Sequence, residues 1–192
     1  MTTKQLIEDI RAITLKNLEI IHEKLVSLDE NQKSWKQNES SWSINDIFAH
    51  LNEYAKFYHE AFKLRIQNTR FTEPKITFIS SPLGRSAWIS MKLGNARNIK
   101  RKFNSPKAYN PTVDVSLLNG NELSDFEKGQ VELLEIIEKA EKVNLRKVKI
   151  PLSISKIIRF RLGDALMYVI YHNERHMQQA LNVLTNPNFP KK

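Results

Sequence analysis

The chain has no cysteine among its 192 residues. It therefore has no disulfide framework, no cysteine-ligated zinc ribbon and no protein thiol that can act as a nucleophile. It also has no run of 18 apolar residues, and its N-terminus does not have the pattern of a signal peptide. We therefore expect no membrane span and a cytoplasmic location. The length suits one ordinary hydrophobic core, so residues 1–192 are predicted to form a single domain.

Acidic residues are absent from two stretches of a chain whose formal net charge is +9. Residues 74–113 contain eight Lys or Arg, and residues 142–161 contain seven more. Such stretches can attract an anionic partner, such as a phosphate, a carboxylate, a nucleic acid or a membrane surface. The alternative is a solvated surface that keeps the protein in solution. Neither stretch matches a nucleic-acid-binding module, so we expect no specific nucleic-acid partner.

Apolar residues recur at helical spacing in four long segments, residues 3–28, 44–68, 124–143 and 162–184. Capping-box patterns precede the second segment, at Ser43 and Asp46, and the third, at Ser124 and Glu127. The linker between these two segments, residues 69–121, is basic and broken by proline and glycine, with one short helix expected near residues 87–100. The sequence therefore predicts an all-α fold, a four-helix bundle with a long crossover or insertion between helices two and three.

The shorter linkers are predicted to be less regular. Residues 29–41 are polar and without periodicity, which indicates a loop. Residues 150–160 are expected to be extended or to form a short turn, and their Lys and Arg residues indicate a surface position.

Two histidines in the last helical segment form the main candidate for a functional site. His172 and His176 are four residues apart, so both rings project from one face of a helix with their Cβ atoms about 5–6 Å apart. Two imidazoles at this spacing can bind one metal ion, and His50 is the best candidate for a third ligand because it flanks the apolar face of the second helix. His59 lies about 180° around that helix from His50, so we expect it to be exposed. His22 is predicted to be a surface or packing residue. The alternative is that the three candidate ligands are core residues bonded to polar neighbours.

The residues around these histidines resemble the motifs of the DinB-like superfamily. Residues 42–51, Trp-Ser-Ile-Asn-Asp-Ile-Phe-Ala-His-Leu, are similar to the W-S-x-x-[DE]-x-x-x-H-L pattern of its second helix. Residues 162–166 and 172–179 are similar to its last-helix pattern, L-G-D-x-L followed by H-x-x-R-H-x-x-Q. The proline-flanked segment 105–111 is similar to a part of its crossover. One departure is Arg161, which stands where a Ser or Thr is usual before Leu-Gly-Asp, and it affects the predicted cap of the last helix rather than the ligands.

This resemblance implies a four-helix bundle with a three-histidine site for a divalent metal, commonly zinc or nickel, held by His50, His172 and His176. It also implies an enzyme that activates a low-molecular-weight thiol for S-transfer to an electrophile. Because the chain has no cysteine, that thiol has to be a small-molecule cosubstrate. Two alternatives stay open: a metal-dependent hydrolase that uses metal-bound water, and a non-enzymatic basic helical protein that binds a partner or acts in a stress response. A homodimer is a further option that the resemblance leaves open.

Four other residues are candidates to orient the histidine rings, each about one helical turn from a histidine: Asp46, Glu53, Tyr168 and Gln179. The simpler interpretations are a helix cap for Asp46, solvated polar side chains for Glu53 and Gln179, and packing for Tyr168. Three basic residues of the insertion are candidates to bind the carboxylates of a thiol cosubstrate: Arg97, Arg101 and Lys102.

Overall fold

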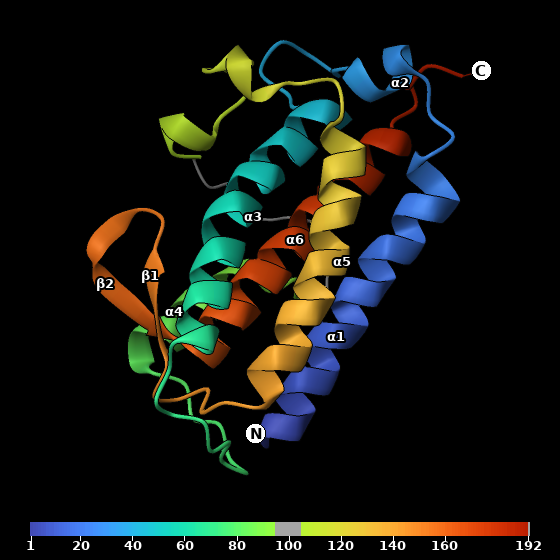
Figure 1. Cartoon of the computed structure of the whole chain (residues 1–192). Coiled ribbons are helices and arrows are strands. Elements are labelled where there is room, and N and C mark those ends of the chain that lie inside the picture. The colour runs from blue at the N-terminus through green and yellow to red at the C-terminus, as the bar shows by residue number, and fades with distance from the viewer. Residues whose placement is uncertain (95–104, 192) are drawn as a thin grey trace.

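The computed structural model describes residues 1–94 and 105–191 of the chain. The described part is mostly helical and contains a small two-stranded sheet (Figure 1). Its long helices lie side by side: α1 (Thr3–Ile20), α3 (Ile44–Gln67), α5 (Glu122–Glu141) and α6 (Leu162–Leu184). α1 and α3 each contact both α5 and α6. No helix in the described ranges is long and apolar enough to cross a membrane.

The shorter elements connect or flank these helices. They are the π-helical turn η1 (Ile21–Leu25), the helices α2 (Glu30–Ser34) and α4 (Pro82–Met91), the 3-10 turns η2 (Lys107–Tyr109) and η3 (Val115–Leu117), and the strands β1 (Lys149–Leu152) and β2 (Ser155–Arg161). The first predicted helix therefore continues past α1 through one wider turn. α2 lies inside the predicted loop 29–41, where Asp29 and Gln32 form a capping box.

The helix that carries His50 begins as the sequence predicts. The backbone N–H of Asp46 donates to Ser43 Oγ at 3.1 Å, and Asp46 Oδ2 accepts from the backbone N–H of Ser43 at 2.8 Å. This reciprocal pair satisfies donors that the first helical turn leaves without an intrahelical acceptor. The capping box therefore sets the start of α3, and with it the face on which His50 lies.

The prediction for the start of the third long helix is wrong. α5 begins at Glu122 rather than after Ser124, and Ser124 lies inside the helix. The Glu122 carboxylate folds back and accepts from the backbone N–H of Asn119 at 2.5 Å and of Gly120 at 2.8 Å. Gly120 has a φ of 82°, a left-handed conformation that suits glycine. This local turn starts the helix earlier than the Ser124 capping box would.

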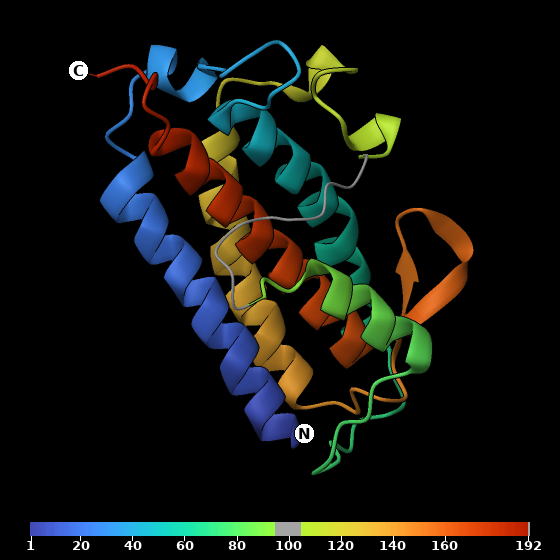
Figure 2. The ribbon, with the colours of Figure 1, turned by 180° about the vertical axis from the view of Figure 1, so that it is seen from behind.

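The insertion between α3 and α5 is attached to α6 through α4 (Figure 2). Asp164 Oδ2 accepts from the backbone N–H of Ser81 at 3.0 Å and from Ser81 Oγ at 2.9 Å. Gly84 allows this contact, because a Cβ at that position would lie 2.3 Å from the same carboxylate oxygen. The short helix predicted near residues 87–100 corresponds in part to α4, and the remainder of that prediction falls on residues 95–104, outside the described ranges.

β1 and β2 form an antiparallel hairpin, in agreement with the extended alternative for residues 150–160. Lys149 pairs with Arg161, Ile150 with Phe160, and Pro151 with Arg159. Side chains alternate across a strand, so buried Ile150 and Phe160 share the inner face of the hairpin. The all-α prediction is therefore correct for the helical majority of the chain and misses this sheet.

Candidate metal centre

Three histidines from two helices meet between α3 and α6. His50 comes from α3, and His172 and His176 come from α6. Their ring centroids are 5.2 Å apart for His50 and His172, 4.8 Å for His50 and His176, and 4.6 Å for His172 and His176. One ring nitrogen from each histidine can be chosen so that all three lie within 4.8 Å of one another. The i, i+4 pair and the core-facing histidine of the second long helix are thus brought to one place.

Hydrogen bonds fix the outer nitrogens of two of the rings. His50 Nδ1 lies 2.6 Å from the carbonyl oxygen of Tyr109, and His176 Nδ1 lies 2.9 Å from Gln179 Oε1. Both acceptors are oxygens, so each Nδ1 carries the proton and donates it. The Nε2 lone pairs of His50 and His176 are therefore left for another partner, as in histidine ligands of metal sites.

The third ring completes the cluster and leaves one atom without a partner. His172 Nε2 lies 3.3 Å from His50 Nε2. His172 Nδ1 is buried and has no hydrogen-bond partner among the described residues. Buried polar atoms are almost always bonded in folded proteins, so an orphan of this kind is typical of a functional site.

Burial keeps the three imidazoles neutral. Desolvation lowers the pKa of His50 to about 4, although the hydrogen bond to the Tyr109 carbonyl opposes the shift. Burial and then the proximity of His50 lower the pKa of His176 to about 3. Burial, followed by the proximity of His176, lowers the pKa of His172 well below its usual range. At pH 7 all three rings are uncharged and present lone pairs, which is the form that binds a metal ion.

Aromatic side chains pack around the cluster and hold the rings in place. Trp42 stacks on His176 with centroids 5.9 Å apart and also contacts His50 at 4.9 Å. Tyr54 contacts the His172 ring at 4.6 Å, and Tyr168 is nearly parallel to it, with an interplanar angle of 7°. In the sequence, Trp42 was identified only as the first residue of the motif at residues 42–51. Its regular place eight residues before His50 was the signal that could have assigned it to the site.

The other predicted site residues divide into two groups. Gln179 contacts His176 directly, and Tyr168 packs against His172. Asp46 instead caps α3 and lies 2.7 Å from Lys36 Nζ, and Glu53 pairs with Lys56. The cap agrees with the simpler interpretation of Asp46. Glu53, predicted in its simpler interpretation to be a solvated polar side chain, has an ion-pair partner in Lys56 rather than a contact with His50.

The insertion contains three predicted site residues and one group at the site that was not predicted. The candidate anion contacts Arg97, Arg101 and Lys102 lie outside the described residues. The Tyr109 carbonyl, which bonds His50, was not predicted. Ser105 Oγ lies 3.1 Å from the same carbonyl oxygen and 3.3 Å from His50 Nδ1. A backbone carbonyl occurs at every residue, so the sequence does not show which one accepts from His50. The similarity of residues 105–111 to a family crossover was the indication that this segment matters.

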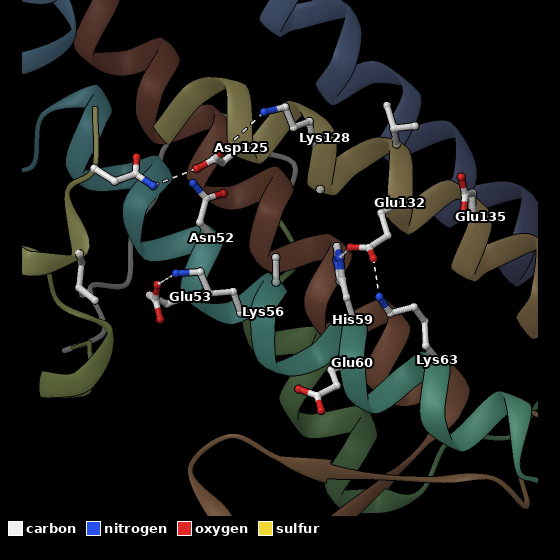
Figure 3. Close-up of a pocket in the computed structure, with 15 residues that line it drawn as sticks. Asn52, Glu53, Lys56, His59, Glu60, Lys63, Asp125, Lys128, Glu132 and Glu135 are labelled. Atoms are coloured by element: carbon white, nitrogen blue, oxygen red, sulfur yellow. Dashed lines mark hydrogen bonds and ion pairs between the residues drawn. The ribbon is translucent and has the colours of Figure 1, made fainter. Parts of the chain in front are cut away.

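The prediction that His59 is exposed is wrong. His59 is only 3% exposed, and its Nδ1 lies 2.7 Å from Glu132 Oε2 on α5 (Figure 3). Lys63 Nζ lies 2.6 Å from the other oxygen of the same carboxylate. His59 does lie on the opposite side of α3 from His50, but that side faces α5. These residues line a surface groove of about 650 Å³, and none of the three clustered histidines lines it.

Comparisons with protein-family models, with curated proteins and with solved structures found no match. The resemblance to the DinB-like superfamily is therefore carried by the motif residues alone. The chemistry of the site follows from the donor set and geometry described above.

The buried neutral histidines predict a pH-dependent stability of the metal-free protein. The unfolded chain protonates its histidines near pH 6.5, whereas the folded protein holds the pKa of His50 at about 4. The unfolded state therefore binds more protons below pH 6.5, and the free energy of unfolding decreases as the pH falls. For each histidine that stays neutral, the expected loss between pH 7.5 and 5.5 is about 1.4 kcal/mol in total, and the slope approaches about 1.4 kcal/mol per pH unit only below about pH 5.5.

Urea unfolding followed by circular dichroism at pH 7.5, 6.5 and 5.5, with a chelator present, measures this slope. His50→Gln should reduce it, because this variant removes one buried neutral imidazole. Equal stability at pH 7.5 and 5.5 would show that the three histidines are not buried in their neutral form.

Proposed function

We propose that the protein is a metal-dependent enzyme in which His50, His172 and His176 hold one divalent ion. The observation that carries this proposal is the convergence of three neutral imidazoles. The Nδ1 protons of His50 and His176 are held by the Tyr109 carbonyl and by Gln179. A donor set of three imidazoles without a carboxylate suits zinc or nickel better than magnesium or calcium. The motif residues support a DinB-like four-helix bundle of one domain, with residues 69–121 as its crossover.

The residues of the site have distinct tasks in this proposal. His50, His172 and His176 would hold the divalent ion, which would supply Lewis-acid activation of a thiol or of water. The Tyr109 carbonyl and the Gln179 amide hold the rings of His50 and His176 in the tautomer that leaves Nε2 unprotonated. Trp42 and Tyr54 cover ring faces and reduce the access of water to the histidines.

The proposed reaction is S-transfer from a low-molecular-weight thiol to an electrophile. With the ion bound, the site would favour the thiolate form of the cosubstrate, because a coordinating thiol is deprotonated. A bond would form between the sulfur and the electrophilic carbon, the bond from that carbon to its leaving group would break, and the thiol proton would pass to solvent. Neutral imidazole ligands leave the positive charge of the ion uncompensated, which favours an anionic ligand such as a thiolate. The chain itself has no cysteine, so the sulfur comes from a cosubstrate. Hydrolysis is the second candidate, since the same Lewis-acid activation applies to water.

Gln179→Ala is expected to weaken metal binding by about 10-fold to 100-fold, because the His176 ring loses the acceptor that fixes its tautomer. Competition with a chromogenic chelator measures the affinity. Gln178→Ala is the matched control, since Gln178 bonds Asn182 on the exposed side of the same helix. Equal affinities for the two variants would remove the orienting role of Gln179.

The reaction class is tested with zinc-loaded and nickel-loaded protein, a bimane-type electrophile and a panel of small thiols. We expect electrophile consumption above the uncatalysed rate only when a thiol is present, and loss of that excess rate in His172→Ala. Consumption of an activated ester without any thiol, lost in the same variant, would instead identify a hydrolase. An excess rate that persists in His172→Ala would separate the activity from the three-histidine site.

A further inference from the structure

The tip of the β1–β2 hairpin exposes three isoleucines within five residues. Ile154 is 67% exposed, Ile157 89% and Ile158 42%. Both views of the molecule show the hairpin projecting from the side of the helices (Figures 1 and 2). Single exposed apolar residues are ordinary on protein surfaces, but a group on a projecting tip is typical of a contact surface.

The hairpin is firmly attached to the helices, so these isoleucines are held away from the core. Its inner face buries Ile150 and Phe160, and Phe160 makes an edge contact with Tyr168 of α6 at 6.0 Å. The backbone N–H of Ser153, next to the tip, donates to the Tyr58 hydroxyl of α3 at 3.4 Å. Ile157 lies where the strand pairing is irregular, between the Pro151–Arg159 and Leu152–Ser155 pairs, and its side chain stays exposed.

The strands behind this tip carry positive charge. Lys149 and Arg159 are exposed, and neither residue is within ion-pair distance of a carboxylate in the described part of the chain. Lys147, just before β1, is also exposed. Residues 142–161 contain no acid, so their charges are not neutralised within the segment. The pKa of Lys149 is lowered, first by partial burial and then by repulsion from Arg161, against an opposing attraction from Asp164.

We propose that this hairpin docks on the surface of an anionic lipid bilayer. Ile154, Ile157 and Ile158 enter the interfacial layer, while Lys149 and Arg159 contact lipid phosphates. The order of the groups favours this partner, because an apolar tip followed by cations matches an apolar interior covered by anionic headgroups. A nucleic acid offers the anions without an apolar layer behind them. This docking needs no membrane-spanning helix, and none is found in the described ranges.

The test is cosedimentation of the full chain with phosphatidylcholine vesicles, with and without about 30% phosphatidylglycerol. We expect binding to the anionic vesicles that weakens in high salt, because counterions screen the attraction. Arg159→Glu should weaken the partitioning at least fivefold, since one basic residue near an anionic surface contributes about that factor. Ile154→Ser with Ile157→Ser should weaken it about 10-fold or more through lost apolar burial.

Ile76→Ser is the matched control, because Ile76 is 85% exposed but lies outside the hairpin, and it should leave binding unchanged. Circular dichroism verifies that each variant is folded. Absence of binding to anionic vesicles at low salt overturns the proposal, as does binding that the isoleucine pair does not affect. A homodimer that the isoleucine variants dissociate, without vesicle binding by the parent, would assign the tip to a second copy of the chain instead.

Discussion

Three uncharged imidazoles between α3 and α6, two of them buried and the third, His176, half-buried, impose the main constraint on this fold. A buried polar ring is costly unless its nitrogens are bonded, so the chain has to bring acceptors to the outward nitrogens. It does so twice, with the Tyr109 carbonyl for His50 and the Gln179 amide for His176. The inward nitrogens are left facing one another, and His50 Nε2 and His172 Nε2 are only 3.3 Å apart. A cation shared among them is the simplest partner that satisfies three lone pairs at once.

The same constraint links the insertion to the helices. The segment that follows residue 104 reaches back to His50 through Tyr109, and the segment before residue 95 is tied to α6 by the bonds from Ser81 to Asp164. α6 therefore carries two of the three histidines and the carboxylate that anchors α4. Ser81 and Tyr109, on either side of residues 95–104, are thus bonded to the two helices that carry the histidines.

How much of this was predictable from the sequence depends on the range of the interactions. The starts of α3 and α6 and the shared face of His172 and His176 follow from local spacing, and these predictions agree with the structure. His59 is buried because α5 packs on its side of α3. From the sequence, that side could be identified as opposite to His50, but the helix that covers it could not. The start of α5 depends on the Glu122 carboxylate, which accepts hydrogen bonds from the preceding turn. The capping pattern at Ser124 is equally regular in the sequence, so the sequence alone does not decide between the two starts. The acceptor for His50 is a backbone carbonyl 59 residues away, which leaves no trace in side-chain types.

Metal content is the most direct test of the central claim. The protein is purified without chelator or affinity tag and measured by plasma mass spectrometry beside His50→Ala and His172→Ala, with His22→Ala as a surface control. The account predicts about one zinc or nickel per chain in the parent and in the control, and loss of that metal in both site variants. A parent that is metal-free and takes up no zinc, nickel or manganese on incubation would contradict it, and the three histidines would then be core residues.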